Sequence, residues 1–259
     1  MDLTDSAIRE FLTFVLVLSR LGGIFLVAPV LGGPAVPKRV RALIAVALAF
    51  ALTPIIAPVQ AVPTELSRLV MGLVGEVGIG LMCGFIVSLS FAAAQMAGEL
   101  IARQMGVSLG EIMNPLYESE TPVFGQFYFL FALVVFVAIN GHYVLVSGLV
   151  HSFERVPVMG AHLHAGMAPM MGALMQEMFV LVIKLAAPAF AALFLVTIAL
   201  GLAARALPQV NIMFVGLPLQ VLVGLLVTGL ALGGAATLLQ RNLDVVARHV
   251  DAAVRFMAS

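Results

Sequence analysis

Six long apolar runs constrain the fold of this chain more than any other feature of its sequence. They cover residues 11–31, 42–59, 69–97, 123–150, 178–204 and 212–239, the fourth being interrupted at Asn140 and Gly141. A helix needs ~20 residues to cross about 30 Å of hydrocarbon, and each run is close to that length or longer. Only 10% of the residues are charged, against roughly 25% in a soluble domain, and 62% are hydrophobic. The sequence therefore predicts an all-α membrane protein with six crossing helices.

One polar segment interrupts this pattern at residues 98–122, which read GELIARQMGVSLGEIMNPLYESETP. Gly106 and Gly110 loosen its backbone, and Asn114 followed by Pro115 ends any helix that continues so far. Its apolar side chains, unusual for a solvated loop, are those of Val107, Leu109, Ile112 and Met113. Two interpretations remain open: an ordinary connection between helices with some hydrophobic contacts, or a loop folded back into protein to line or block a cavity.

Three charged residues lie inside the apolar runs: Arg20, Glu76 and Lys184. Each would cost roughly 2.5–3.5 kcal/mol at the centre of a helix that faces lipid, so each is expected to be paired or to face protein or water. One interpretation is pairing within the chain, for example of Glu76 with Arg20 or Lys184. The other is contact with further subunits in place of lipid. The loop charges favour contact with subunits, since six Lys and Arg on one side against five on the other set no orientation.

Glycines at four-residue spacing predict close packing of helices. Gly80 and Gly84 form one such pair, and Gly229 and Gly233 form another. A small residue at both positions lets two helix backbones approach each other closely. Together with the charges inside the apolar runs, these pairs indicate a chain built for tight helix assembly.

The last stretch, residues 240–259, has the pattern of an amphipathic helix. Its charged stripe comprises Arg241, Asp244, Arg248, Asp251 and Arg255. Its apolar stripe comprises Leu243, Val246, Val250, Val254 and Met257. Acid precedes base by four residues in two pairs, which is the favourable orientation on a helix. We expect this helix to continue the sixth run and to offer its apolar face to a partner or a membrane surface, although its mixed charges argue against lipid.

The sequence contains no catalytic constellation, phosphate-binding loop or dinucleotide fingerprint. His162 and His164, with His151 or Glu154, come nearest to a metal site, but nothing gives them helical ligand geometry, and a solvated loop explains them better. Acidic and basic residues balance at 13 each, so no net charge attracts nucleic acid. The sequence predicts a protein that is not an enzyme and has no cofactor, no metal and no nucleic-acid partner.

An ordered set of short motifs points to a known family. The pieces are 36–40 (VPKRV), 98–100 (GEL), 104–108 (QMGVS), 114–115 (NP), 140–142 (NGH), 199–202 (ALGL) and 205–211 (RALPQVN), with Phe214, Gly216 and Pro218 after them. In this order they resemble the FliR family, an integral component of the flagellar type III export gate. Asn114 stands where that family usually has aspartate, and Thr197 where it often has asparagine. A role that needs a charge at residue 114 is therefore not carried over.

The resemblance implies a non-enzymatic role in the bacterial inner membrane, in the basal body of the flagellum. FliR-like proteins join FliP and FliQ subunits in a hetero-oligomeric assembly of helical hairpins that forms the entrance of the export channel. FlhB and FlhA lie nearby, and unfolded flagellar proteins are the substrates. By this resemblance, residues 1–177 correspond to a FliP-like region of helical hairpins with a plug loop at about 104–122, and residues 178–259 correspond to a FliQ-like hairpin.

The plug of the family maps onto the polar segment of this chain. The residues implied in it are Met105, Gly106, Val107, Ser108, Leu109, Gly110, Met113, Asn114 and Pro115. Glycines would give such a loop mobility, and its valine, leucine and methionine side chains would form a soft seal that excludes water. The residues implied in contacts between helices or subunits are Arg20, Glu76, Lys184 and Arg205.

Two other interpretations remain. The equivalent subunit of a virulence-type injectisome shares fold and mechanism, although the pieces at 104–108 and 205–209 favour the flagellar system. A secondary transporter also has several spans, broken helices and charges near the midplane of the membrane. It would bind its substrate as a single chain, and the second half of this sequence shows no obvious repeat of the first.

Overall fold

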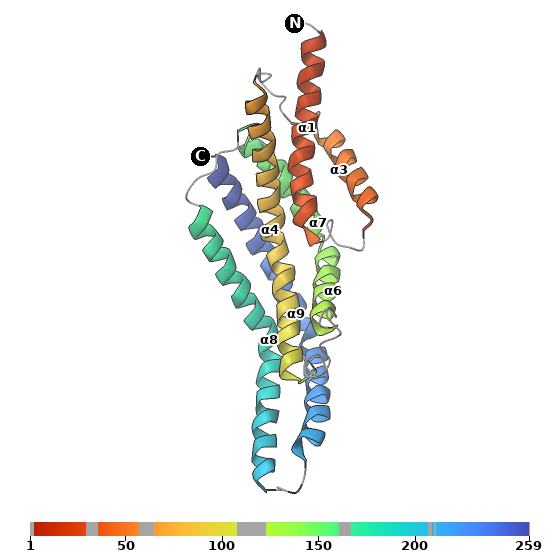
Figure 1. The fold of residues 1–259 in the computed structure, drawn as a ribbon, viewed down its shortest axis with the longest axis vertical. Helices are drawn as coiled ribbons and strands as arrows, with labels where there is room; N and C mark the ends of the chain where they lie inside the picture. Colours follow the sequence, from red (N-terminus) through yellow and green to blue (C-terminus); the bar gives the residue numbers. More distant parts are fainter. Residues whose placement is uncertain are drawn as a thin grey trace. The chain divides into compact units, whose positions relative to one another are not determined.

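The regular structure of the chain is helical (Figure 1). The computed structural model describes residues 3–29, 36–56, 65–107, 123–160, 167–206, 209 and 211–258. The helices are α1 (Leu3–Val27), α3 (Lys38–Leu52), α4 (Leu66–Gln104), α6 (Val123–Ala138), α7 (Gly141–Arg155), α8 (Met167–Ala206) and α9 (Ile212–Ala258). These described ranges contain no strand, which confirms the all-α prediction for them.

In the part of the chain that the structure describes, fewer helices are long and apolar enough to cross a membrane than the six apolar runs predict. Within the described ranges, four are long and apolar enough, namely α1, α4, α8 and α9, and the pair α6 and α7 adds a fifth if it forms one broken span. Of the run 42–59, residues 42–52 lie in α3, which has only 15 residues and ends at Leu52. Pro54 lies just beyond that end, and its ring and missing N–H do not suit a helix interior. The six crossing helices are therefore not confirmed.

The run 123–150 bends where its sequence predicts an interruption. The helices α6 and α7 differ in direction by 70° across a short break. Asn140, in that break, has a φ of 57°, a left-handed conformation that asparagine tolerates better than most residues. The bend thus follows from a local backbone preference.

The described residues form two compact units, each assembled from segments far apart in the sequence. Unit 1 takes Met1–Leu89, Asn140–Met175 and Leu243–Ser259, and unit 2 takes Ser90–Ile139 and Gln176–Asn242. The helices α4, α8 and α9 contribute residues to both. The division after residue 177 that the family resemblance implies follows the order of the chain rather than its packing, and it stays a prediction.

In unit 1, glycines bring α1 and α4 into backbone contact. A Cβ atom added at Gly84 would lie 3.0 Å from the Ile24 carbonyl oxygen, and Gly80 lies closer still to the backbone of Arg20. Figure 1 shows α1 (red) beside the first part of α4 (orange). Side chains at these two positions would push the helices apart, so the first glycine pair packs as its spacing predicts.

The apolar stripe of the C-terminal tail is covered within unit 1. The tail continues α9 without a break, as predicted. The stripe residues that are at least nine-tenths buried are Val246, Val250, Val254 and Met257. Val250 packs against Gly148 of α7, and Asp251 pairs with Arg255 at 2.6 Å and with Arg155 of α7 at 3.0 Å. This face is therefore already occupied, and the expectation that it is available to a partner or a membrane is wrong.

In unit 2, α6 packs along the second part of α4. The ring centroid of Phe91 in α4 lies 5.9 Å from that of Phe129 and 5.4 Å from that of Phe136, both in α6. Two turns further along α4, Gly98 lies directly against the backbone of Phe124. Because residue 98 has no side chain, the first turn of α6 is held tightly against α4.

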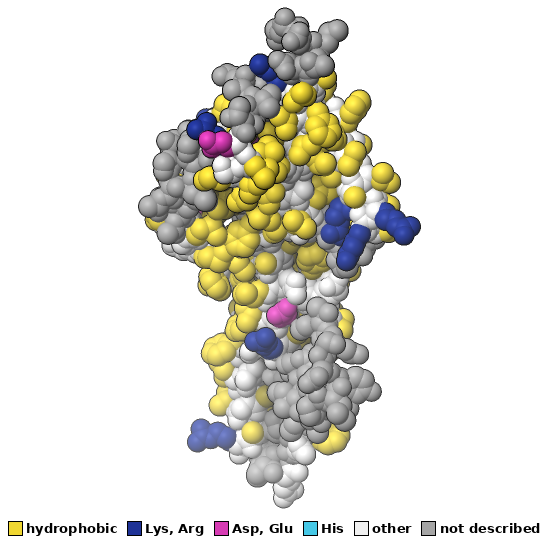
Figure 2. Space-filling view, turned by 45° about the horizontal axis from the view of Figure 1, so that its top comes forward, with side chains coloured by type: hydrophobic (Ala, Val, Ile, Leu, Met, Phe, Trp, Pro, Cys, Tyr) yellow, Lys and Arg dark blue, Asp and Glu magenta, His cyan; other side chains and the backbone are white. Residues whose placement is uncertain are grey.

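Large apolar side chains cover much of the surface of the chain. Figure 2 shows a face on which hydrophobic side chains predominate and charged ones are few. Phe50, Phe214 and Leu230 are 75%, 82% and 86% exposed. Gly229 and Gly233, the second glycine pair, have no described atom within 4 Å of an added Cβ, so they pack against nothing in the described part of the chain. Exposed apolar surface of this kind indicates cover by lipid or by other protein chains.

Candidate functional site

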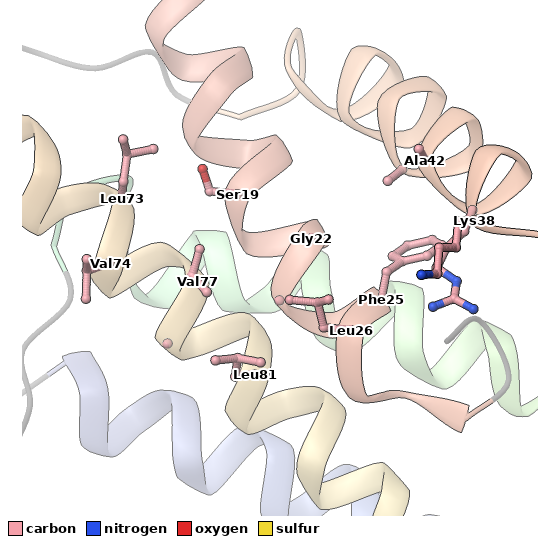
Figure 3. Close-up of a pocket in the computed structure, with 14 residues that line it drawn as sticks. Ser19, Gly22, Phe25, Leu26, Lys38, Ala42, Leu73, Val74, Val77 and Leu81 are labelled. Carbon is pink, nitrogen blue, oxygen red and sulfur yellow. The ribbon is translucent and has the colours of Figure 1, made fainter. Parts of the chain in front are cut away.

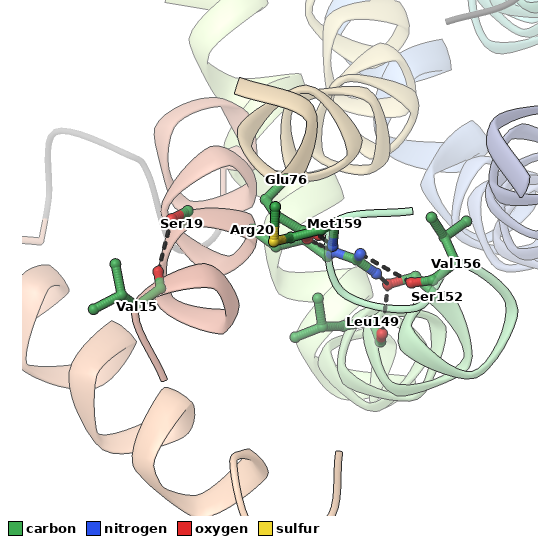
Figure 4. A network of polar contacts seen from close by, with 8 residues as sticks. All are labelled: Val15, Ser19, Arg20, Glu76, Leu149, Ser152, Val156 and Met159. Atoms are coloured by element: carbon green, nitrogen blue, oxygen red, sulfur yellow. Dashed lines mark hydrogen bonds and ion pairs between the residues drawn. The ribbon is translucent and has the colours of Figure 1, made fainter. Parts of the chain in front are cut away.

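A buried ion pair links α1 to α4 in unit 1 (Figure 4). The Arg20 Nε donates to Glu76 Oε2 at 2.5 Å, and neither side chain is exposed to solvent. The guanidinium also donates to the Ser152 hydroxyl at 3.0 Å and to the Val156 carbonyl at 3.1 Å. The central carbon of the guanidinium, Arg20 Cζ, lies 3.9 Å from the centre of the Phe153 ring. These contacts satisfy a charge that solvent does not reach.

The second oxygen of Glu76 holds the segment that follows α7. Glu76 Oε1 accepts a hydrogen bond from the Met159 backbone N–H at 2.9 Å. Met159 has a φ of 69°, which L-residues rarely adopt, and this bond helps to stabilise it. The Met159 side chain packs over Gly72 of α4, where an added Cβ would lie 3.1 Å from the Met159 Cε. One carboxylate therefore joins α1, α4 and the end of α7.

The surroundings of this pair make it a structural element rather than a reactive one. Burying two charges costs several kcal/mol for each ion, and only good geometry with further hydrogen bonds offsets that cost. Both Arg20 and Glu76 have such bonds. Removing one partner of a buried pair typically destabilises a protein by roughly 3–5 kcal/mol, because it leaves the other charge alone. The pair thus keeps α1, α4 and α7 in register.

The other charges singled out in the sequence lie elsewhere. Glu76 pairs with Arg20, the first of its two expected partners, whereas Lys184 lies in α8 of unit 2 and is exposed. Lys184 lines a surface hollow with Arg241 of α9 and forms no ion pair with any residue in the described ranges. Arg205 is exposed in the last turn of α8. Contacts of Lys184 and Arg205 with other subunits stay predictions.

The end of α4 shows how the chain enters the polar segment. Gly106 takes a φ of 76°, which glycine adopts without steric cost. Its N–H donates to the Arg103 carbonyl at 3.1 Å, and the Val107 N–H donates to the Ala102 carbonyl at 3.2 Å. These two bonds form the Schellman motif, which ends a helix at glycine. Gly106 therefore stops α4, in contrast to the loosening role that the sequence suggests.

Met105 anchors the start of the polar segment in unit 2. Its side chain is fully buried and lies over Gly224 of α9, where an added Cβ would meet Met105 Cγ at 2.7 Å. Only a residue without a side chain leaves this space open. Val107, two residues later, is 44% exposed. Met105 thus packs among the helices of unit 2, and Val107 is the last described residue before α6.

At the other end of the polar segment, the described chain resumes at Val123, where α6 begins. Gly125 lies against the side chain of Glu99, with 2.8 Å between an added Cβ and Glu99 Cγ. Glu99 accepts a hydrogen bond from Gln95 at 3.1 Å and, within the described chain, forms no ion pair with Arg103, the partner its spacing suggests. Both ends of the polar segment are therefore held in unit 2, by α4, α6 and α9.

Most of the predicted plug lies between these two attachments. The structure describes Met105, Gly106 and Val107. The remaining plug residues lie outside the described ranges: Ser108, Leu109, Gly110, Met113, Asn114 and Pro115. The structure thus shows how the segment is attached at each end, and its role as a plug stays a prediction.

Several residues on which these sites depend carry no signal in the sequence. Ser152 and Met159 supply partners to the buried pair, and Gly224 makes room for Met105. Ser152 is separated from Arg20 by 132 positions, and no local pattern marks such a contact. Gly224 precedes Gly229 by five residues, so it falls outside the four-residue spacing that indicates close packing.

In the described ranges, no group of three or more His, Cys, Asp and Glu residues is placed to hold a metal ion. His162 and His164 lie outside those ranges, so the interpretation of this pair stays a prediction. The structure provides a buried ion pair that joins α1, α4 and the end of α7 in unit 1. It also provides a polar segment whose two ends are attached to helices of unit 2.

The fold and its composition define a class: a helical membrane protein with four to five candidate spans among its described residues. A family model described as "Bacterial export proteins, family 1" matches residues 11–245. The chain therefore belongs to this family of bacterial export proteins.

Three relatives agree with this assignment, and each carries the name "Flagellar biosynthetic protein FliR". That of Bacillus subtilis (strain 168) is 33% identical over 225 residues, 85% of either protein. That of Escherichia coli (strain K12) is 33% identical over 198 residues, 76% of either protein. That of Caulobacter vibrioides is 30% identical over 222 residues, 85% of this chain and 88% of the relative. The resemblance to the FliR family is confirmed.

Proposed function

We propose that this protein is a non-enzymatic component of the flagellar type III protein export gate. In this role it forms the entrance and part of the plug of the channel for unfolded flagellar proteins. The observation that carries the proposal is the attachment of the polar segment at both ends, by the helix stop at Gly106 and by the start of α6 at Val123. Membership of the bacterial export family and the names of the FliR relatives support the flagellar system over the injectisome.

The first residue of the proposed plug is fixed by packing, and the residues that follow are adaptable. Met105, packed on Gly224, holds the start of the plug in unit 2. The segment continues with Leu109, Gly110 and Met113. Leucine and methionine side chains adapt to an irregular space and exclude water, so a loop of this composition closes a narrow pore without rigid complementarity. When the loop moves aside, an unfolded chain passes, and no covalent bond is made or broken.

The proposed partners cover the apolar surface that the chain exposes. Side chains such as Phe214 and Leu230 are more than four-fifths exposed, which supports contact with further subunits in addition to lipid. These subunits are FliP and FliQ in a hetero-oligomeric complex, with FlhB and FlhA nearby. Residues 1–177 act as the FliP-like region and residues 178–259 as the FliQ-like hairpin. The assembly lies in the bacterial inner membrane, in the flagellar basal body.

A pull-down of the tagged, full-length chain from its native membranes in a gentle detergent tests this proposal. Native mass and partner identity are measured on the same sample. We expect a large complex that contains FliP-like and FliQ-like chains. Injectisome subunits in their place would move the protein to a virulence system. A stable monomer or homodimer without them would contradict the export role and favour a secondary transporter.

A further inference from the structure

A trough on the surface of unit 1 combines an apolar lining with a basic end (Figure 3). Its volume is about 720 Å³, and pockets for small ligands typically have ~300–1,000 Å³. The floor is α1 at Gly22, one wall is α4 with Val77 and Leu81, and the other is α3 with Lys38 and Ala42. The trough therefore lies entirely between the three helices α1, α3 and α4.

The apolar part of the trough has open space because two of its lining residues are glycines. A Cβ atom added at Gly22 or Gly78 has no other atom within 4 Å. Ser19 carries the only hydroxyl among the described lining residues, and it already donates to the Val15 carbonyl at 2.7 Å (Figure 4). No unsatisfied hydroxyl is thus offered here, which suits a hydrocarbon chain and not a polar group.

The end of the trough at the start of α3 is positively charged. Lys38 and Arg41 line it, Arg39 lies between them in the sequence, and the described lining residues include no acid. Lys38 is exposed and forms no ion pair with any described residue, while Arg41 also donates to the Val36 carbonyl at 3.3 Å. No side chain caps the N-terminus of α3, so the helix dipole adds to the positive potential. An anion complements this end.

We propose that this trough binds an anionic phospholipid. Lys38 and Arg41 hold its phosphodiester headgroup, and an acyl chain lies over Gly22 and Gly78. Both α1 and α4 are long and apolar enough to span a membrane, and the basic end lies where α1 ends and α3 begins. Basic pockets between membrane helices bind anionic headgroups in this way. A phospholipid has one charged end and an apolar remainder, and the trough has the same division.

The headgroup contact is tested on the purified full-length protein in its native complex. Native mass spectrometry follows titration with phosphatidylglycerol and, separately, with the zwitterionic phosphatidylcholine. We expect tighter binding of phosphatidylglycerol, and about fivefold weaker binding of it to Lys38→Gln, since one base near a membrane surface contributes that much. Arg68→Gln is the matched control, because Arg68 is an exposed base of unit 1 outside the trough that pairs with Glu65.

A second variant tests the acyl-chain contact. Gly78→Leu fills the trough without a clash at its Cβ, so we expect the fold and complex size to be kept and the binding of both lipids to be lost. Gly172→Leu, also free of close atoms but outside the trough, should bind both lipids as the unchanged protein does. Helix content and complex size are measured for every variant.

Two outcomes would overturn the lipid assignment. One is equal affinity of the unchanged protein, Lys38→Gln and Gly78→Leu for phosphatidylglycerol. The other is a segment of a partner protein crosslinked into the trough, with lipid excluded from the assembled complex. Neither outcome affects the export role, which the pull-down tests independently.

Discussion

Single residues constrain this protein most strongly where a side chain or a backbone conformation has no substitute. Arg20 and Glu76 are wholly buried, and each neutralises the other. Gly106 ends α4 in a conformation that a residue with a Cβ atom adopts only at a cost. Gly224 leaves the space into which Met105 packs. These residues hold the helices in their packing, so replacing them should first lower the stability of the protein and only then affect its function.

Replacing Arg20 by leucine leaves the Glu76 carboxylate buried without its partner. We expect Arg20→Leu to lower the free energy of unfolding by roughly 3–5 kcal/mol. The double variant with Glu76→Leu should recover part of that loss, because two apolar side chains need no ionic partner. Thermal unfolding of the purified chain in detergent measures both variants.

The control for this experiment is an ion pair on the surface. Arg68 and Glu65 pair at 3.7 Å with most of both side chains exposed. Arg68→Leu should therefore cost less than about 1 kcal/mol. A double variant at Arg20 and Glu76 that is no more stable than Arg20→Leu alone would show that the loss does not come from an unpaired buried charge.

Replacing Gly106 by alanine puts a Cβ atom on a residue whose φ is 76°. We expect Gly106→Ala to destabilise the protein by roughly 1–2 kcal/mol, which is the cost of a left-handed conformation for an L-residue. Gly172→Ala in α8 should be neutral or stabilising, since alanine favours a helix interior. Thermal unfolding compares the two, and amide hydrogen exchange at residues 104–107 reports on the end of α4. Equal effects would show that the φ of Gly106 is not constraining.

Among the helices, α4 has the largest number of roles. It meets α1 through Gly80 and Gly84, packs on α6 through Phe91 and Gly98, and ends at the Gly106 stop. Apolar residues surround this helix instead of forming a single stripe, as expected for a helix with neighbours on several sides. Because α4 leads directly into the polar segment, the position of that segment depends on how α4 is packed.

Deleting residues 108–110 shortens the polar segment and leaves both of its attachments in place. Three extended residues span about 10 Å, so we expect the shortened loop no longer to reach across the pore. The assembled gate should then leak ions while its size stays unchanged. Conductance of the purified complex in a planar bilayer measures the leak, and native mass measures assembly.

A deletion of the same length in another connection is the control. Removing residues 162–164, between α7 and α8, shortens the chain equally outside the proposed plug. This variant should assemble and remain tight. A 108–110 deletion that assembles and is as tight as the unchanged protein would rule out the plug assignment.

The molecule as a whole exposes apolar side chains, and a few of its exposed charges form no ion pair within the described residues. Lys184 is exposed in α8, within a helix long and apolar enough to span a membrane. A lysine that faces lipid at the centre of such a helix costs roughly 2.5–3.5 kcal/mol. We therefore expect another subunit to contact it, which makes Lys184 a probe of assembly.

Reversing the charge of Lys184 should weaken the assembled complex. We expect Lys184→Glu to lower the yield of complex by about tenfold, which corresponds to about 1.4 kcal/mol in an interaction between subunits. Arg68→Glu makes the same change of charge on an exposed side chain of unit 1 and should leave the yield unaltered. The yields are read from native mass after the pull-down. Equal yields of the two variants would exclude a subunit contact at Lys184.

Features that depend on a few neighbouring residues were predictable from the sequence. The bend at Asn140 follows from the left-handed preference of asparagine, and the helical tail follows from its three- and four-residue periodicity. The packing of Gly80 and Gly84 follows from a spacing that leaves a groove on one face of the helix. The run 42–59 was misleading, because its apolar composition suggests a span but Pro54 lies inside it.

The sequence by itself determined the helical class, the membrane character and the family, because these depend on composition, periodicity and the order of short motifs. Only the tertiary structure decided that Glu76 meets Arg20 and not Lys184, that Met105 packs over Gly224, and that Val250 of the tail packs against Gly148 of α7. Arg20 and Glu76 are 56 positions apart, and the guanidinium of Arg20 also reaches Ser152, 132 positions away. Which distant side chains meet depends on how whole helices pack, and no local pattern carries that information.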